Sequence, residues 1–553
     1  MTTFAMSCKD FYKTDHKSQY PDFSEQVYSN GTPRSDRLSP IPSTLAKELG
    51  VDGKVVWFGL QAFQIDFLIN EYKDTFFNVP KRQAVRRYKR RLDNSVGKDA
   101  VDVSHVEALH DLGYLPIEIR SLPEGSLVNI KVPCFTIHNT LEDYYWLVND
   151  LETVMSSEVW KPSTSATIAF AYRKLIQKFA VETGAPLDFV PIQGHDFSFR
   201  GMSGRHDAAM TGMGHLLSFI GTDTIPAIDA AEDFYFADSD KELIGISVPA
   251  TEHSVMCMGT QESEVETFRR LIEDIYPVGI VSIVSDTWDY WKVLTEYTVE
   301  LFDKIKARKP ITDEDGNVLV PGRTVFRPDS GCPVKIITGY KVFDKYTFDS
   351  VDKALEHATD FPQDTYDYEA YKLANGTYVS LETEKLLTDA EVKGSVQVLW
   401  DIFGGTRTDE GYRMLDDSVG LIYGDSITLE RANAILTRLK DKGFASSNIV
   451  FGIGSYTYQY VTRDSFGWAV KATAGVVAGE VRELMKDPAT DDGTKKSAKG
   501  YLRVEKEGDD FVLYDCQTWE QAQQGELQVV FRNGELVNPS TFGEIRERLA
   551  ANL

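Results

Sequence analysis

From residue 185 onwards, short apolar runs rich in β-branched residues alternate with helical stretches, and this alternation constrains the fold more than any other feature. The runs end in polar or glycine-rich tips: "DFVPIQGHDFSFRG", "LIGISVPATEHS", "VGIVSIVSD", "RTVFRPDSG", "VGLIYGD" and "NIVFGIGS". Helical stretches such as "EVETFRRLIEDI" and "LERANAILTRLKDK" lie between them. Near-continuous apolar strands separated by helices are typical of a parallel sheet buried on both faces. This many units favours an irregular β/α barrel, with an open doubly wound sheet as the alternative.

The first part of the chain has a different pattern. Apolar positions at helical spacing run through 55–95, and their basic stretch "KRQAVRRYKRR" is typical of a solvated helix face. From residue 114 the alternation of apolar and polar residues indicates a small, mostly antiparallel sheet, and two helices follow it. We therefore expect an N-terminal helical and β-sheet domain over 1–184.

Three further boundaries follow from composition. Residues 333–415 are acidic and tyrosine-rich, and Asn375–Gly376 is a hairpin signal, so this range is predicted to be an insertion. The barrel, including the insertion, is expected over 185–474. Residues 475–553 predict a lysine-rich loop, a strand pair, a hairpin at Asn533–Gly534 and a terminal helix, which together pack back on the N-terminal domain.

Composition excludes several classes of protein. The formal net charge of −25 disfavours nucleic acid and anionic membranes as partners. The cysteines are scattered, without metal-binding or disulfide spacing, which fits a reducing compartment. The start of the chain lacks the apolar core of a signal peptide, and no apolar run reaches the length of a membrane span. We expect a cytoplasmic protein.

The strand tips collect charged residues and glycines, and the carboxyl ends of barrel strands are where chemistry gathers. Gly424 and Gly454 sit at strand-to-helix turns, whose backbone N–H groups can bind phosphate. Arginines can hold phosphate bidentately, while Asp329 and Asp425 can bind ribose hydroxyls or, through water, magnesium. Each signal alone has a structural alternative: "GIGS" can be a tight turn, and Arg327 with Asp329 a structural ion pair. Together they predict a phosphate-binding active site.

Eleven ordered motifs carry a resemblance that is more specific than any one of them. They are "KDFYKTDHKSQYP", "LPIEIRSLPEG", "GHDFSFRGMS", "FIGTDT", "SVPATEHS", "SIVSD", "FRPDSG", "YGD", "FGIGS", "TRDSFGWAVKAT" and "KKSAKG". In this order the chain resembles the nicotinamide phosphoribosyltransferase family, from about residue 10 to the C-terminus and outside the insertion. The resemblance implies the type II phosphoribosyltransferase fold and a homodimer with two active sites at its interface. It also implies synthesis of nicotinamide mononucleotide and pyrophosphate from nicotinamide and 5-phosphoribosyl 1-pyrophosphate, with Mg²⁺ held mainly through substrate phosphates.

The same resemblance assigns the site residues. Phe197 and Tyr12 of the partner subunit are expected to stack on the two faces of nicotinamide, and Asp223 to accept a hydrogen bond from its carboxamide. Arg327 and Ser282 are also expected to line the nicotinamide site. The ribose and phosphate residues are Asp329, Gly424, Asp425, Gly454 and Ser455, with Arg463 and Lys471 expected from the partner subunit. The residues expected to bind pyrophosphate are Arg200, Arg34 and His253. The catalytic set is His253, Asp329, Arg327 and Glu252.

His253 is expected to be phosphorylated by ATP, because the matching histidine of the family is. Neutral imidazole is a nucleophile, and Glu252 beside it in the sequence is predicted to support it. Two departures bear on phosphate binding: Ser455 stands where the family has a glycine, and Ala469 where it has a serine. The alternatives are a nicotinate phosphoribosyltransferase and a non-catalytic binding protein that retains the fold. The side chain of Asp223 could instead cap the helix that follows it.

Overall fold

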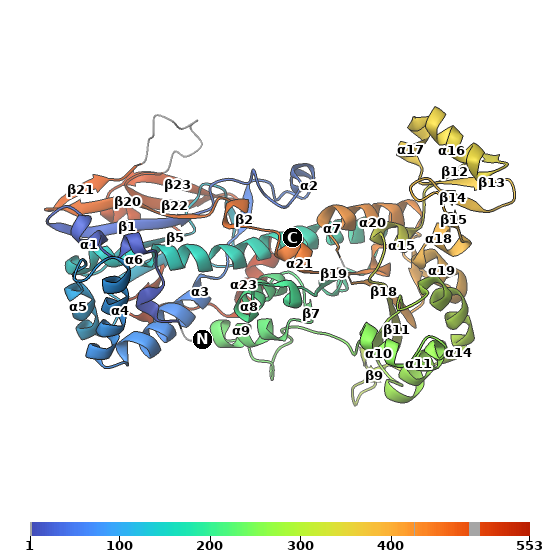
Figure 1. Cartoon of the computed structure of the whole chain (residues 1–553), viewed down its shortest axis with the longest axis horizontal. Helices are drawn as coiled ribbons and strands as arrows, with labels where there is room; N and C mark the ends of the chain where they lie inside the picture. Colours follow the sequence, from blue (N-terminus) through green and yellow to red (C-terminus); the bar gives the residue numbers. More distant parts are fainter. Residues whose placement is uncertain (1–2, 425, 486–497) are drawn as a thin grey trace.

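The structure is a computed structural model of the chain and describes residues 3–424, 426–485 and 498–553. Two sheets organise it (Figure 1). One, parallel, lies on the right of Figure 1, and the other, antiparallel, lies on the left. The predicted fold class, a parallel β/α barrel sheet with an added antiparallel sheet and helices, is confirmed.

The parallel sheet has six strands, every neighbouring pair of which is parallel. Their order across the sheet is β7 (Gly221–Thr222), β6 (Gly194–Asp196), β19 (Val450–Ile453), β18 (Val419–Tyr423), β11 (Arg323–Arg327) and β8 (Ile280–Val284). The side chains along β8, β18 and β19 are largely buried, as expected for strands covered on both faces.

The sheet is closed through the segment that the sequence predicts as a strand, "LIGISVPATEHS". This segment forms no regular strand, so that prediction is wrong in detail. It makes single parallel bridges to both edges of the sheet, from Ile246 to Gly221 of β7 and from Ala250 to Ser282 of β8. Pro249 lies between the two bridges and has no N–H to give to a ladder, which accounts for the interruption.

The antiparallel sheet is built from strands far apart in the sequence. Its order is β21 (Glu480–Glu483), β20 (Ala469–Val477), β1 (Ser24–Thr32), β5 (Phe135–Asn139), β3 (Ile117–Ser121), β24 (Gln528–Arg532) and β25 (Glu535–Leu536). Strands β24 and β25 form the hairpin predicted at Asn533–Gly534, where both residues have positive φ. The sheet therefore joins the N-terminal part of the chain to its C-terminal segment.

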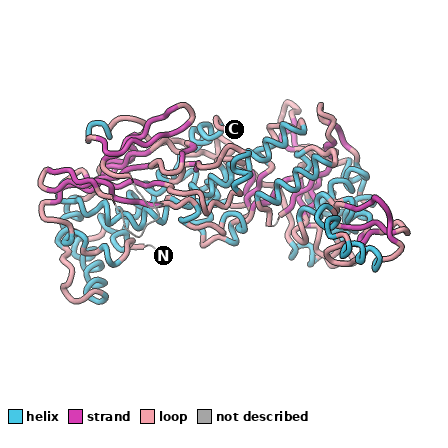
Figure 2. Tube along the Cα trace, turned by 90° about the horizontal axis from the view of Figure 1, so that it is seen from above, coloured by secondary structure: helices cyan, strands magenta, loops and turns pink. Residues whose placement is uncertain are grey.

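Helices fill the space around the two sheets (Figure 2). The basic stretch forms α4 (Lys81–Ser95), beside α5 (Ser104–Leu112), and the predicted pair of helices is α6 (Tyr145–Glu158) and α7 (Trp160–Thr183). Most of α7 is buried, because it packs on α8 (Arg205–Leu216) and α20 (Leu429–Asp441) of the barrel as well as on β2 (Lys54–Val56). The terminal helix α23 (Phe542–Ala550) is also present.

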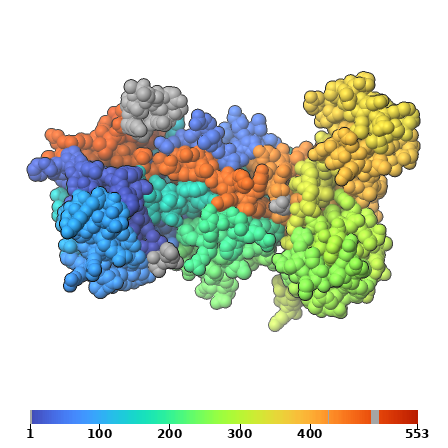
Figure 3. Space-filling view, in the orientation of Figure 1, coloured from blue at the N-terminus to red at the C-terminus, as the bar shows by residue number. Residues whose placement is uncertain are grey.

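Part of the range 333–415 forms a lobe that projects from the body (Figure 3). It contains β12 (Val342–Phe348), α16 (Val351–Asp360), α17 (Pro362–Asp367), β13 (Ala370–Leu373) and β14 (Tyr378–Ser380), and it has its own small core. Strands β13 and β14 form the hairpin predicted at Asn375–Gly376. By contrast, α15 (Pro333–Thr338) and α19 (Ser395–Phe403) contribute to the main core. Arg438 of α20 ties the lobe to the barrel by a 2.9 Å hydrogen bond from Nη1 to Glu369 Oε2.

The described part of the chain holds no helix whose length and apolar character would suit a transmembrane span.

Candidate functional site

The carboxyl ends of the parallel strands bring most of the predicted site residues to one edge of the sheet. Because the strands are parallel and adjacent, the residues that follow β6, β7, β8, β11, β18 and β19 emerge on the same side. Phe197 follows β6, Asp223 follows β7, and Asp329 follows β11 after the strand ends at Arg327. Gly424 and Gly454 follow β18 and β19.

Asp223 lies at the centre of a small hydrogen-bonded group. Its Oδ1 lies 2.9 Å from His195 Nε2 and accepts a 2.6 Å hydrogen bond from Ser247 Oγ. Burial acts to raise the pKa of Asp223, but the contacts with His195 and Ser247 and the field of Arg327 outweigh it and lower that pKa below its usual value. Asp223 is therefore an ionised hydrogen-bond acceptor, and its side chain is 42% exposed. The N-cap of α9 (Ile225–Tyr235) is Thr224, so the alternative role of Asp223 as the side-chain cap is wrong.

Phe197 forms an aromatic wall next to this carboxylate. Its ring lies 4.7 Å from the His195 ring, and its backbone N–H donates to Ile453 O at 3.0 Å. A Cβ on Gly452 would lie 2.6 Å from the Phe197 ring, so only glycine at that position lets the ring approach β19. Ser282 is buried in β8, and its backbone pairs with the 249–251 segment.

Arg327 and Asp329 lie beside each other at the end of β11. Arg327 Nη2 donates a 2.6 Å hydrogen bond to Thr251 O, and Arg327 Nε lies 4.0 Å from Asp329 Oδ1. A Cβ on Gly424 would stand 2.2 Å from that same Oδ1, so glycine lets the turn after β18 approach the Asp329 carboxylate. The predicted partner Asp425 lies outside the described residues.

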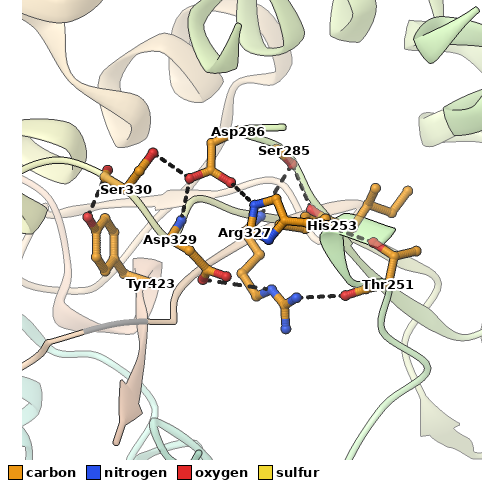
Figure 4. A network of polar contacts seen from close by, with 10 residues as sticks. Thr251, His253, Ser285, Asp286, Arg327, Asp329, Ser330 and Tyr423 are labelled. Carbon is orange, nitrogen blue, oxygen red and sulfur yellow. Dashed lines mark hydrogen bonds and ion pairs between the residues drawn. The ribbon is translucent and has the colours of Figure 1, made fainter. Parts of the chain in front are cut away.

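His253 begins the short helix α10 (His253–Met258), and its nearest carboxylate is Asp286 (Figure 4). His253 Nε2 lies 3.1 Å from Asp286 Oδ1, while Asp286 Oδ2 accepts hydrogen bonds from Asp329 N at 2.8 Å and Ser330 Oγ at 2.6 Å. Burial acts to raise the pKa of Asp286, but the three hydrogen bonds outweigh it and the pKa is lowered. A buried, ionised aspartate thus orients an imidazole whose side chain is 48% exposed.

Glu252 does not make the contact with His253 that its place in the sequence suggests. It is the N-cap residue of α10, and its carboxylate accepts a hydrogen bond from Ser254 Oγ. Consecutive residues at the start of a helix point in different directions, so adjacency in the sequence does not bring their side chains together. The residue that sequence reasoning assigned no role is Asp286, and its place at the tip of "SIVSD" was the available signal.

Gly454 and Ser455 stand where β19 meets α21 (Ser455–Tyr458). No atom lies within 4 Å of a Cβ placed on Gly454, so the space beside it is open. A Cβ on Gly201 would fall 2.1 Å from Ser455 Oγ, which shows how closely the turn that carries Arg200 approaches α21. Arg200 itself is exposed.

Four predicted residues lie elsewhere: Lys471 on the antiparallel sheet, Arg463 in a short 3-10 helix before β20, Arg34 after β1, and Tyr12 on the N-terminal segment. Lys471 is in β20 opposite Asn30 of β1, with 57% of its side chain exposed. Arg34 follows β1 and donates from Nε to Gly467 O at 3.0 Å; burial and repulsion from Arg463 lower its pKa. Tyr12 is 64% exposed. Figure 1 shows β1 and β20 on the left, β7 and α21 near the centre, and β11 and α10 on the right, so the sheet that carries Lys471 lies away from the part of the rim formed by β11 and α10.

Carboxylates at the rim are few in number. Among the described residues, no three His, Cys, Asp or Glu side chains come together to hold a metal ion. The Asp329 backbone N–H donates to Asp286 Oδ2 at 2.8 Å, so these two aspartates are neighbours at the rim. Mg²⁺ commonly takes one or two carboxylates, with the remaining ligands from substrate phosphates and water. The donor set therefore fits an ion that arrives with a phosphorylated substrate.

Comparison with known proteins identifies the family of the chain. A model of the nicotinate phosphoribosyltransferase (NAPRTase) family matches residues 192–535. The chain is 54% identical over 544 residues to a nicotinamide phosphoribosyltransferase of Acinetobacter baylyi, covering 98% of this chain and 96% of that protein. A nicotinamide phosphoribosyltransferase of Mycoplasma pneumoniae is 32% identical over 392 residues, covering 70% and 71% of the two chains.

A solved structure supports the fold alone. The crystal structure of nicotinate-nucleotide pyrophosphorylase from Pyrococcus furiosus matches with a TM-score of 0.51 at 13% identity, covering 99% of this chain and 95% of that one. The membership expected from the motifs is thus confirmed. The chain belongs to the nicotinate phosphoribosyltransferase family, a family of pentosyltransferases, and has nicotinamide phosphoribosyltransferases among its nearly full-length relatives.

Proposed function

We propose that this protein is a nicotinamide phosphoribosyltransferase of NAD salvage. It would convert nicotinamide and 5-phosphoribosyl 1-pyrophosphate into nicotinamide mononucleotide and pyrophosphate. The observation that carries the proposal is the ionised Asp223, held by His195 and Ser247 beside the Phe197 ring. The likeness to the Acinetobacter baylyi enzyme over almost the whole chain supports the same reaction.

Asp223 provides a reason for choosing the amide. Nicotinamide offers an NH₂ donor to the Asp223 carboxylate, whereas nicotinate offers a second negative charge. The Phe197 ring provides a flat surface for the electron-poor pyridine, with Tyr12 of the partner subunit on its other face. Arg327 donates to Thr251 O, in the same closing segment whose Ser247 holds Asp223, and would line the nicotinamide site from that side.

Catalysis would depend on position and charge. As pyrophosphate leaves, the ribosyl centre acquires oxocarbenium character, and the ring nitrogen of nicotinamide forms the new bond to C1 of ribose. Asp329 and Gly424 would hold the ribose, and Gly454 with Ser455 would hold the 5′-phosphate, a role that the open space beside Gly454 supports. Arg200 would hold the pyrophosphate. Bound Mg²⁺ would neutralise part of the phosphate charge, and holding both reactants in line supplies much of the remaining rate enhancement.

The site is completed by a second copy of the chain. The barrel rim carries the carboxylates Asp223, Asp286 and Asp329. The cations expected at the phosphates lie elsewhere: Lys471 in β20, Arg34 just after β1 and Arg463 in the short helix before β20. Arg34 Nε donates to Gly467 O at 3.0 Å, so Arg34 lies beside the turn that follows Arg463, and burial together with repulsion from Arg463 lowers the pKa of Arg34. A bound phosphate would relieve that repulsion. A homodimer in which each protomer presents this face to its partner's rim would form two such sites.

His253 is proposed to accept a phosphoryl group from ATP. With Nε2–H directed at Asp286, the lone pair of Nδ1 is free to attack the γ-phosphorus, which forms an N–P bond and releases ADP. Phosphohistidine would then add negative charge beside the pyrophosphate and magnesium. The cytoplasmic location belongs to the same proposal, and the described cysteines, all unpaired, are consistent with it.

The test is a direct assay. Purified protein with ¹⁴C-nicotinamide, 5-phosphoribosyl 1-pyrophosphate and Mg²⁺ should form labelled nicotinamide mononucleotide, and ATP should increase the rate. A parallel assay with ¹⁴C-nicotinate covers the second candidate, which the name of the matching family keeps open. If kcat/KM is larger for nicotinate than for nicotinamide, nicotinate replaces nicotinamide as the proposed substrate. If neither substrate gives a product, the protein is a non-catalytic binding protein that retains the fold.

A further inference from the structure

The N-terminal segment that carries Tyr12 lies along one face of α6, held there by polar contacts. Tyr145 OH donates to Lys17 O at 3.2 Å, Asn149 O accepts from Lys13 Nζ at 3.1 Å, and Thr153 Oγ1 donates to Asp10 Oδ2 at 2.7 Å. Residues three or four apart share a helix face, and these three are spaced four apart. The contacts fix the backbone on which Tyr12 sits, although the Tyr12 side chain is exposed.

Glu152 occupies the same face and makes contacts in two directions. Its Oε2 lies 3.4 Å from Lys13 Nζ, and its Oε1 lies 3.6 Å from Lys471 Nζ on β20. The Lys13 side chain is 2% exposed, so it is fixed, whereas the Lys471 side chain is 57% exposed and extends toward solvent. Glu152 on α6 therefore pairs both with the buried ammonium of Lys13 and with the exposed ammonium of Lys471.

Lys13 is held by more than Glu152. Its ammonium also donates to Asn149 Oδ1 at 3.3 Å, and it lies 5.5 Å from the centre of the Tyr12 ring. The Asn149 amide oxygen also contacts His16 Nδ1, and the His16 ring stands 5.5 Å from that of Tyr12. Loss of the Glu152 charge would leave Lys13 with its two Asn149 acceptors, but would leave Lys471 without the carboxylate it pairs with.

We propose that Glu152 is a positioning residue, which holds the Lys471 ammonium at the place where the partner subunit's substrate phosphate binds. The proposal rests on the proposed function, because it takes Lys471 as a phosphate ligand in a shared site. Glu152 does not touch substrate. It lowers the entropy that Lys471 loses on binding, because a lysine side chain otherwise samples many rotamers.

The experiment is a double-mutant cycle of Glu152→Gln and Lys471→Ala. Glutamine keeps the shape of the side chain and removes its charge. Glu152→Gln should raise KM for 5-phosphoribosyl 1-pyrophosphate about three- to fivefold, the range expected for a partly exposed ion pair, and leave KM for nicotinamide unchanged. In the Lys471→Ala background the same change should have no further effect on that KM. Glu158→Gln, on the same helix but paired with His206, is the matched control and should leave both KM values unchanged.

The outcomes separate the two proposals. Suppose that Lys471→Ala raises KM for 5-phosphoribosyl 1-pyrophosphate and that Glu152→Gln raises it equally with and without Lys471. Glu152 then acts on the fold, and the positioning role is wrong. The same conclusion follows if Glu152→Gln lowers kcat and both KM values together. If Glu152→Gln leaves KM unchanged, the positioning role is also wrong. A wild-type protein without transferase activity would instead overturn the proposed function, and an ineffective Lys471→Ala would remove Lys471 from the site and the positioning role with it.

Discussion

The rim of the parallel sheet and the face formed by β1, β20 and the N-terminal segment differ in charge and in how their side chains are held. At the rim, Asp223 and Asp286 are fixed by hydrogen bonds, and histidines contact both of them. On the other face, Arg463 and Lys471 are about half exposed and project from the surface. Under the proposed function, this difference makes each region one half of a shared phosphate-binding site. The rim would recognise the base and the ribose, and the cations of the other region would neutralise phosphate.

The largest effect should come from placing one substitution in each of the two regions, on different subunits of a dimer. Tyr12→Ala on the sheet face and Asp329→Ala at the rim should each lower kcat/KM about 100-fold, because each removes a group that positions a reactant. Mixing the two inactive variants should restore about a quarter of wild-type activity, since half of the dimers are mixed and one of their two sites is intact.

The measurement is nicotinamide mononucleotide formation after subunit exchange, with exchange followed by differently tagged subunits. Tyr12→Ala mixed with Arg463→Ala is the matched control, because both lesions lie on the same face and no mixed dimer has an intact site. Recovery in the control, or none in the test pair once exchange is demonstrated, would contradict the shared site.

The second largest effect concerns the rim alone. Asp223→Ser should lower kcat/KM for nicotinamide and raise it for nicotinate, so that the ratio of the two changes about tenfold or more. Like charges at contact distance repel by at least 1.4 kcal/mol in a cleft of reduced dielectric. Steady-state rates with both substrates measure the ratio. An unchanged ratio in a folded variant would remove Asp223 from substrate choice, and Asp229→Ser, further along α9, serves as the control.

A third, smaller effect tests the contact between His253 and Asp286. Asp286→Asn should slow phosphorylation by γ-labelled ATP about tenfold, because a neutral amide no longer fixes Nε2 as the protonated nitrogen. His253→Ala should abolish the acid-labile label and the stimulation by ATP while the basal reaction persists. Glu252→Gln is the matched control, since Glu252 contacts Ser254. A stronger effect from Glu252→Gln than from Asp286→Asn would return the supporting role to Glu252.

Much of the barrel could be predicted from sequence, because apolar runs with helices between them specify buried parallel strands. The closing segment 246–250 could not, since its apolar residues resemble a strand and the interruption depends on Pro249 and on bridges to two distant strands. The order of the antiparallel sheet was equally hidden, because β20 and β24 join it from far along the chain.

The candidate site, like the fold, could be predicted from the sequence only in part. Arg327 and Asp329 could be placed at a strand tip because they lie in the run "RTVFRPDSG", whereas Asp223 was assigned through the resemblance that "FIGTDT" carries. The contact from His253 to Asp286 spans 33 residues, and only folding brings the two side chains together. Glu152 gave no signal in the sequence, because a glutamate on an amphipathic helix is ordinarily a solvated residue. Its role depends on two lysines from β20 and the N-terminal segment.

The smallest effect contrasts a histidine on each side of the molecule. In the antiparallel sheet, burial lowers the pKa of His138 to about 4, with Glu118 opposing the shift and Arg120 and Arg532 adding to it. In α8, a hydrogen bond with Glu158 raises the pKa of His206. The unfolded chain binds a proton near pH 6.5, so His138 makes the fold less stable as the pH falls below that value. His206 makes the fold more stable as the pH falls through its raised pKa, and this contribution is fully present below about pH 6.5.

His138→Phe should therefore reduce the loss of unfolding free energy between pH 7 and pH 5 by about 1–2 kcal/mol, the amount that a pKa lowered by this much can contribute by pH 5. Phenylalanine preserves the edge-to-face contact with Trp519, whose ring lies 4.9 Å from that of His138. His206→Gln, as the opposite control, should steepen the loss. Urea unfolding at the two pH values measures both. If wild type and His138→Phe lose the same unfolding free energy between pH 7 and pH 5, His138 is accessible to protons in the folded sheet. The contrast between the two regions would then be confined to the groups that bind substrate.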